Sequence, residues 1–174
     1  MTELTTLRLV LRPATVDDAA FFVELNKDPE IRRFTGDQEF SDVADAADFL
    51  DNRDPYQILG FGRWMILHRA TRQPAGWCGI KNQLDDMGIV DLGCRLHKDF
   101  RRSGYATEAS LALLEWGFSA KNLDVITARV MPENTPSIAA LHRIGMEYLK
   151  HDTCGPHPAD WYQLSRAKWA NKGG

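Results

Sequence analysis

The chain has 174 residues, of which 44% are hydrophobic and 26% charged, and its formal net charge is −3 at pH 7. This length and composition indicate one domain over residues 1–174, large enough to bury a core without disulfides or metals. The slightly acidic balance argues against a nucleic-acid partner, because it offers no excess of Lys and Arg to neutralise a phosphate backbone.

Cysteine usage and hydrophobic runs indicate the compartment. The three cysteines, Cys78, Cys94 and Cys154, are not closely paired, which suits a reduced cytosol better than a disulfide framework. The N-terminal stretch MTELTTLRLVLRP has charges inside its first apolar run and no signal-peptide core. No window approaches 18 uncharged apolar residues, so no membrane span is expected. We therefore expect a cytoplasmic protein without a membrane partner.

The first predicted elements are a strand and two helices. Leucines alternate with other residues over 7–12, a period of two that predicts a half-buried strand ending at Pro13. Thr15, followed three residues later by Asp18, is typical of a helix N-cap. A second helix is expected over Ser41 to Leu50.

The middle of the chain alternates between strands and a helix. Three strands are predicted over residues 62–70, 74–82 and 88–96. The segment from Tyr105 to about Ala120 is apolar nearly all round, which predicts a helix packed against a sheet. Another strand is expected over 124–131.

The predicted C-terminal elements complete the fold class. Thr135 and Pro136 are expected to begin a short helix that ends at Gly145. Residues 160–169 are predicted as the last strand. Strands and helices alternate along the chain, so we predict an α/β protein with a mixed sheet.

The turn before the long helix has a pattern suited to an anion. Arg101, Gly104 and Ala106 form the spacing Arg-x-x-Gly-x-Ala. The N–H groups at a helix N-terminus lack intrahelical partners and the helix dipole adds partial positive charge, so such a turn favours an anion. Arg101 and Arg102 would add charged donors for phosphate oxygens. A capped helix with solvated arginines explains the same residues, and the turn lacks the sequences of a P-loop and of a dinucleotide fingerprint.

Several motifs in order give this chain a family resemblance. The Arg-x-x-Gly-x-Ala turn, the stretches TLRLVLRPATVDDA, GWCGI and GYATEA, and the later NTPSIAALHRIGM resemble the GNAT N-acetyltransferase superfamily and its RimJ/RimL-like branch. The resemblance spans about Thr6 to Lys168. It implies a single-domain fold with a mixed, mostly antiparallel, twisted sheet flanked by helices, and acetyl-CoA as cosubstrate. Its pyrophosphate would be held by the turn residues Arg101, Arg102, Ser103, Gly104, Tyr105 and Ala106.

The resemblance also implies roles along one strand and one helix. The pantetheine arm would lie along Leu92, Gly93, Cys94, Arg95 and Leu96, and a backbone N–H near Cys94 to Leu96 would meet the oxyanion. Asn134 would bond the pantetheine, and Ser137 would lie near the sulfur and protonate the thiolate. The alternatives are a turn residue at Asn134 and a first-turn hydroxyl at Ser137. Many GNAT enzymes carry a tyrosine acid at the position that is Leu141 here, so Ser137 or water must serve.

The proton of the amine needs an acceptor unless the amine is already neutral. Asp91 could take it directly or through water, and the alternative is a surface pair of Asp91 with Arg95. His97 lies at a predicted strand end, where a structural role is favoured. An α-amine with a pKa near 8 is partly neutral without a base, whereas a lysine is mostly charged. This favours N-terminal amines as acceptors.

Two further segments suggest ligands. Residues 37–54 contain seven acidic residues and one basic residue, which would attract a basic peptide or a polyamine if they bordered the acceptor site. The favoured alternative is a solvated helix face. His151, Cys154 and His157 are spaced like metal ligands, but the intervening Gly-Pro-His-Pro run predicts a loop, so no metal is expected.

The resulting hypothesis is an enzyme that transfers an acetyl group from acetyl-CoA to a primary amine by direct attack, with Cys94 not acting as a nucleophile. A protein or peptide N-terminal amine is the first expected acceptor. A small amine, such as a polyamine or an antibiotic, is an alternative. A non-catalytic acyl-CoA sensor is the alternative from another class, because the usual tyrosine is missing. Both a monomer and a homodimer are compatible with the sequence.

Overall fold

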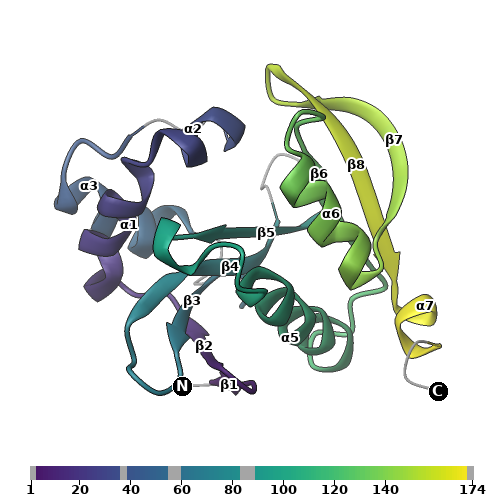
Figure 1. The fold of residues 1–174 in the computed structure, drawn as a ribbon, viewed down its shortest axis with the longest axis horizontal. Coiled ribbons are helices and arrows are strands. Elements are labelled where there is room, and N and C mark those ends of the chain that lie inside the picture. The colour runs from purple at the N-terminus through teal and green to yellow at the C-terminus, as the bar shows by residue number, and fades with distance from the viewer. Residues whose placement is uncertain (1–2, 36–38, 55–59, 83–88, 172–174) are drawn as a thin grey trace.

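An eight-stranded sheet runs through the computed structural model, which describes residues 3–35, 39–54, 60–82 and 89–171 (Figure 1). Its strand order is β1-β2-β3-β4-β5-β6-β8-β7, and every neighbouring pair is antiparallel except the parallel pair β5 and β6. The predicted mixed, mostly antiparallel sheet is confirmed. The strands are β1 (Leu4–Thr5), β2 (Leu9–Pro13), β3 (Arg63–His68), β4 (Pro74–Asn82), β5 (Val90–Leu96), β6 (Val125–Val130), β7 (Glu147–Cys154) and β8 (His157–Ser165).

Helices cover both faces of this sheet. One apolar cluster joins α5 and α6 to one face, and a second cluster joins α1 and α3 to the other. No described helix is both long enough and apolar enough to cross a membrane. The helical elements are η1 (Val16–Asp18), α1 (Ala19–Asn26), α2 (Pro29–Thr35), α3 (Val43–Asp48), the π-helical turn η2 (Phe49–Arg53), η3 (Lys98–Phe100), α5 (Tyr105–Ser119), α6 (Thr135–Ile144) and α7 (Arg166–Ala170).

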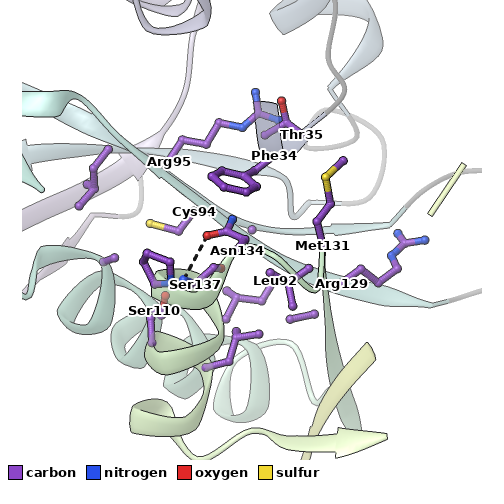
Figure 2. Close-up of a pocket in the computed structure, with 18 of the residues that line it drawn as sticks. Phe34, Thr35, Leu92, Cys94, Arg95, Ser110, Arg129, Met131, Asn134 and Ser137 are labelled. Carbon is purple, nitrogen blue, oxygen red and sulfur yellow. Dashed lines mark hydrogen bonds between the residues drawn. The ribbon is translucent and has the colours of Figure 1, made fainter. Parts of the chain in front are cut away.

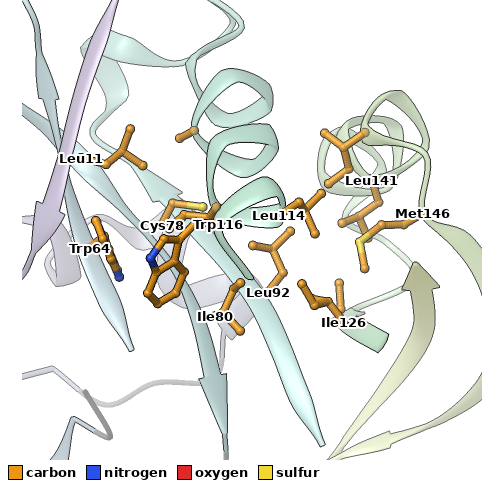
Figure 3. Packing of buried hydrophobic residues seen from close by; sticks show 14 of the residues in the cluster. Leu11, Trp64, Cys78, Ile80, Leu92, Leu114, Trp116, Ile126, Leu141 and Met146 are labelled. Carbon is orange, nitrogen blue, oxygen red and sulfur yellow. The ribbon is translucent and has the colours of Figure 1, made fainter. Parts of the chain in front are cut away.

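The larger cluster packs α5 against the middle of the sheet (Figure 3). Trp64 on β3 is fully buried and meets Trp116 on α5 edge-on, with ring centroids 4.9 Å apart. Gly117 brings the helix close to the strands, because a Cβ there would lie 2.6 Å from Cδ1 of Ile80. The helix predicted from Tyr105 is therefore confirmed in place and in packing.

The first predicted strand is buried on both faces, so the half-buried prediction is wrong. Leu9, Val10 and Leu11 of β2 are all buried, whereas Leu7, before the strand, is 83% exposed. Leu9 and Leu11 join the α5 cluster, and Val10 joins the opposite cluster under α1 and α3. A helix layer on the second face removes the alternation expected of a one-sided strand.

Other boundaries also differ from the sequence prediction. The short β1 and the helix α2 had no sequence signal that we recognised. The last strand ends at Ser165, whose side chain accepts a hydrogen bond from the N–H of Lys168 and so begins α7. The N-cap of α6 is Asn134 rather than Thr135, while Gly145 ends that helix with a φ of +86°, as predicted.

The parallel pair β5 and β6 creates an opening in the sheet. Asp91 lies opposite Thr127, and no further registered pair forms between the described residues of these strands. Beyond Asp91, the edge of β5 that faces β6 therefore separates from its neighbour. The N-terminus of α5 and the helix α6 lie beside this opening (Figure 1).

Candidate active site

A cleft of about 630 Å³ occupies the opening between β5 and β6 (Figure 2). Residues 91–96 of β5 form one wall, and residues 128–130 of β6 with the following Met131 form the other. The turn before α5, the helices α6 and α2, and residues of β4 and around the turn between β7 and β8 complete the lining. The predicted site residues that line the cleft are Asp91, Leu92, Gly93, Cys94, Arg95, Leu96, Arg101, Arg102, Gly104, Ala106, Asn134 and Ser137.

The turn before α5 presents backbone N–H groups to the cleft. Gly104 is the N-cap of this 15-residue helix with a φ of +80°, and Arg102 also has a positive φ, of +59°. The first N–H groups of a helix have no acceptor within it. Ser103 and Tyr105 lie outside the lining: the Ser103 hydroxyl donates to the Arg101 carbonyl, and the Arg8 guanidinium lies 4.5 Å from the Tyr105 ring centroid. The turn can therefore bind an anion mainly through its backbone.

Arg101 is held by two carboxylates. Its Nη1 donates to Glu30 (2.6 Å), its Nη2 to Asp28 (2.5 Å) and its Nε to the Leu96 carbonyl (3.0 Å). Burial would raise the pKa of Asp28, but hydrogen bonds from the Glu30 N–H and from Arg101 outweigh it and lower that pKa. Arg101 therefore ties the turn to the beginning of α2.

A second arginine, Arg8, supports the turn from the position just before β2, and no pattern in the sequence indicated this role. Arg8 donates from Nη1 to the Ser103 carbonyl (2.8 Å) and from Nε to Glu108 (2.7 Å). Glu108 also accepts from the Thr6 hydroxyl (2.6 Å). Burial would raise the pKa of Glu108, but these hydrogen bonds and the charge of Arg8 lower it overall. The first turn of α5 is thus fixed to the N-terminal strands.

The side chains of β5 alternate between the two faces of the sheet. Leu92, Cys94 and Leu96 belong to the cluster under α5. Cys78 lies opposite Cys94 on β4, and a hydrogen bond between the two thiols together with burial raises the pKa of Cys94 well above its usual value. A thiol held in the protonated form is a poor nucleophile. This agrees with the expectation that Cys94 does not attack the thioester.

Asp91 is buried and does not form the surface pair with Arg95 that we considered. Its carboxylate lies 3.4 Å from Nε of Arg129 and 3.4 Å from the hydroxyl of Thr127. Burial raises the pKa of Asp91, and this effect is larger than the lowering caused by the positive charges of Lys81 and Arg129. A carboxylate with a raised pKa is a stronger base. Arg129, which comes from another strand, could not be paired with Asp91 from sequence spacing.

Asn134 and Ser137 meet at the start of α6. Oδ1 of Asn134 accepts a hydrogen bond from the backbone N–H of Ser137 (3.3 Å), as the dashed line in Figure 2 shows. This is the N-cap interaction, so the turn role considered for Asn134 is present. The Asn134 amide retains two N–H donors, and Ser137 lines the cleft. Leu141 is buried against the core and offers no acid.

The remaining wall of the cleft consists of aromatic and basic side chains. Phe34 and Thr35 come from α2, and Figure 2 shows them beside Arg95. Trp77 on β4 is buried, yet it also lines the cleft. The Arg95 guanidinium lies 5.1 Å, and the Lys81 ammonium 5.5 Å, from the Trp77 ring centroid. Nothing in the sequence indicated that Trp77 lines the cleft.

The acidic stretch 37–54 does not border this cleft within its described residues. Asp42 caps α3, Asp48 accepts from Asn52, and the buried Asp54 pairs with Arg63 at 2.7 Å. None of the described acidic residues of this stretch is among the lining residues, and Asp37 lies outside the described residues. The acidic wall, the less favoured of the two interpretations, is therefore wrong for α3: Asp42 caps this helix, and the favoured solvated helix face agrees with the structure.

The histidines noted in the sequence also have structural surroundings. His97 begins η3, where its Nδ1 accepts from the Asp99 N–H (3.4 Å), as its predicted structural role requires. Nδ1 of His151 lies 2.8 Å from Asp160, while Cys154 and His157 line the far end of the cleft. Across the described ranges no three His, Cys, Asp or Glu side chains are gathered as metal ligands.

Comparison with known proteins agrees with this geometry. Residues 8–147 match the family model described as an acetyltransferase (GNAT) domain. The uncharacterized N-acetyltransferase p20 of Bacillus licheniformis is 32% identical over 148 residues, covering 84% of this chain and 83% of the relative. Two solved structures share the fold. One is the ribosomal-protein-S5-alanine acetyltransferase of Vibrio fischeri (TM-score 0.82, 14% identity, 97% of this chain and 99% of that one). The other is the spermidine N-acetyltransferase of Vibrio cholerae in complex with CoA and spermine (TM-score 0.80, 16% identity, 95% and 100%). The chain belongs to the GNAT acetyltransferase family.

Proposed function

We propose that this acetyl-CoA-dependent acetyltransferase binds acetyl-CoA across the opening between β5 and β6 and transfers the acetyl group directly to a primary amine. The observation that supports this most is the joint placement, on one cleft, of a helix N-terminus and of a strand edge that is not registered with β6 beyond Asp91 in the described part of the chain. The edge of β5 beyond Asp91 can pair with an amide-containing arm, as an added strand would. The N-terminus of α5 can hold a phosphate at the end of that arm.

The residues present fit such a ligand. The backbone N–H groups of the turn that follows Arg101, with Arg102 exposed beside them, hold the pyrophosphate. Gly104 keeps the approach to these groups open, because a Cβ there would meet, among the described residues, just the far end of Arg8, 3.3 Å away. The backbone of residues 92–96 pairs with the pantetheine, and the Asn134 amide donates to it.

Two side chains transfer protons in the proposed reaction. Acetyl-CoA supplies an acetyl thioester, whose oxygen gains negative charge as the amine attacks. A backbone N–H of residues 94–96 stabilises that charge. The Ser137 hydroxyl gives its proton to the departing thiolate, and Asp91, directly or through water, takes a proton from the amine. The raised pKa of Asp91 suits it to that second step.

A protein or peptide N-terminal amine is the acceptor that we propose first. An α-amine with a pKa near 8 reaches the neutral, nucleophilic form more easily than a lysine or a polyamine does. The Vibrio fischeri neighbour is named for a ribosomal protein and the Vibrio cholerae neighbour for spermidine, so both acceptor classes occur on this fold. A small-molecule amine is therefore the alternative within the enzyme class.

Replacement of Ser137 tests the proposed acid. Ser137→Ala should leave the Kd of acetyl-CoA, measured by calorimetry, near that of the parent, while CoA-thiol release falls by about 100-fold or more. Ser119→Ala is the matched control, because Ser119 lies at the far end of α5 and donates only to the Glu115 carbonyl. An unchanged rate in Ser137→Ala would remove the acid role. Tight acetyl-CoA binding without turnover of any amine by the parent would favour the sensor alternative.

A further inference from the structure

Basic side chains outnumber carboxylates among the described residues that line the cleft. Two described carboxylates line it, Glu30 and Asp91, against six basic side chains. Glu30 is already engaged with Arg101. The basic lining residues are Lys81, Arg95, Arg101, Arg102, Arg129 and Arg143.

Arg95 occupies the critical position among these cations. It follows Cys94 on β5, beside the proposed path of the thioester, but its side chain lies on the other face of the strand. There its guanidinium is 5.1 Å from the Trp77 ring centroid, and its Nη1 is 3.2 Å from Oδ1 of Asn26. Figure 2 shows this side chain extending from the strand towards Thr35. A planar guanidinium matches a carboxylate with two parallel hydrogen bonds.

Arg95 also lies between the cleft and a second cavity. That cavity, of about 200 Å³, shares Arg95 and Trp77 with the cleft. Its other walls are Phe22, Asn26, Phe40, Phe49 and Arg63. The charge of Arg63 is matched by the buried Asp54 at 2.7 Å. The cavity is therefore largely aromatic, with a cation at its junction with the cleft.

We propose that the acceptor is a primary amine that carries a carboxylate within a few bonds, bound by Arg95, with an adjoining apolar group in the aromatic cavity. This rests on the proposed function and names the substrate class of the same site. The cations also favour the neutral form of the bound amine, because like charges lower the pKa of an ammonium. The carboxylate can come from an acidic residue beside a peptide N-terminus or from the α-carboxylate of a free amino acid.

The test compares acceptors that carry a carboxylate near the amine with acceptors that carry additional positive charge. Two peptides with free N-termini carry Asp or Lys at their second and third positions, and free phenylalanine and spermidine complete the panel. We expect kcat/KM to be about tenfold or more higher for the Asp peptide or for phenylalanine than for the Lys peptide and spermidine, the effect of one charge-assisted hydrogen bond. A higher kcat/KM for the Asp peptide would identify an acidic residue beside the N-terminus as the source of the carboxylate, and a higher kcat/KM for phenylalanine would identify the α-carboxylate of an amino acid. If kcat/KM for the Lys peptide or for spermidine equals that for both carboxylate acceptors, the proposal is wrong and the acetyltransferase function still stands.

Variants assign the effect to Arg95. Arg95→Gln should reduce the preference for the carboxylate acceptor to less than about threefold, and Arg95→Lys should restore part of it. Arg69→Gln is the control, because Arg69 is exposed and donates to the Thr6 carbonyl. A preference that persists in a folded Arg95→Gln variant would overturn the assignment.

Binding measurements test the carboxylate site at Arg95 separately from the acetyltransferase function. Calorimetric titration of the Asp and Lys peptides and of phenylalanine into the protein loaded with CoA does not require turnover. Carboxylate ligands that bind through Arg95 without turnover of any amine would refute the proposed function while supporting the carboxylate site. Equal binding of both peptides, with no binding of phenylalanine, would refute the carboxylate site.

Discussion

Gly104→Val tests the anion-binding turn directly. Gly104 has a φ of +80°, a conformation that a β-branched residue adopts only with strain of about 1–3 kcal/mol. In the variant the turn relaxes to a different backbone conformation, and acetyl-CoA must restore the original one in order to bind. If all of the strain opposes binding, the Kd of acetyl-CoA rises by a factor on the order of 5 to 150.

Gly155→Val is the matched control for this strain. Gly155 lies in the turn between β7 and β8 with a φ of +58°, and a Cβ there would meet no atom within 4 Å. Both variants should unfold at a lower urea concentration than the parent, because strain that the turn does not relieve by relaxing lowers the stability of the folded state. Only Gly104→Val should weaken acetyl-CoA binding in calorimetry.

Two results would refute the reasoning. An unchanged Kd in a folded Gly104→Val variant would show that the turn does not hold the phosphate. A Kd that rises equally in Gly155→Val would show that the affinity follows general stability and not the backbone of the turn.

Three further changes have expected outcomes. Asp91→Asn should lower kcat by about 100-fold or more. It should also remove the acidic limb of the pH–rate profile, because the rate of the parent rises as the pH passes the raised pKa of Asp91. An unchanged profile would exclude Asp91 as the base. Glu108→Gln should lower the Tm at pH 7. The pKa of Glu108 is lowered from 4.5, so the stability that its charge adds is complete above pH 4.5 and is lost as the pH falls through the lowered value, and the two melting curves should converge there. Trp64→Ala should reduce the free energy of unfolding in urea by about 3–5 kcal/mol, whereas Leu7→Ala, at a position 83% exposed, should change it by less than about 0.5 kcal/mol; similar losses would contradict the described core.

Local signals predicted much of the fold. The capping pair Thr15 and Asp18 marked the start of the first helical segment, and the apolar stretch after Gly104 marked α5. Errors arose where burial depends on distant segments. The two-sided burial of β2 results from α1 and α3 packing on a face that the pattern of residues 7–12 suggested was exposed.

The site shows the same division. The turn containing Gly104 and the Asn134–Ser137 motif could be found from sequence, because each is one continuous motif, although the N-cap of α6 was predicted one residue too late. The contact of Arg129 with Asp91 joins neighbouring parallel strands, and that of Arg8 with Glu108 joins residues 100 positions apart. No spacing rule predicts such pairs, since they depend on strand order.

Arg101 illustrates why a motif residue needs its structure before a role is assigned. In the sequence its position before Gly104 suggested a phosphate ligand, and its charge is indeed beside the turn. Asp28 and Glu30 already neutralise that charge, and both come from the start of the helix that presents Phe34 and Thr35 to the cleft. The positive potential left for a phosphate therefore comes from Arg102 and the N–H groups of α5. Through Arg101 the same turn also fixes the position of α2. If α2 borders the acceptor, as we propose, a change at this arginine should affect acceptor use as well as acetyl-CoA binding.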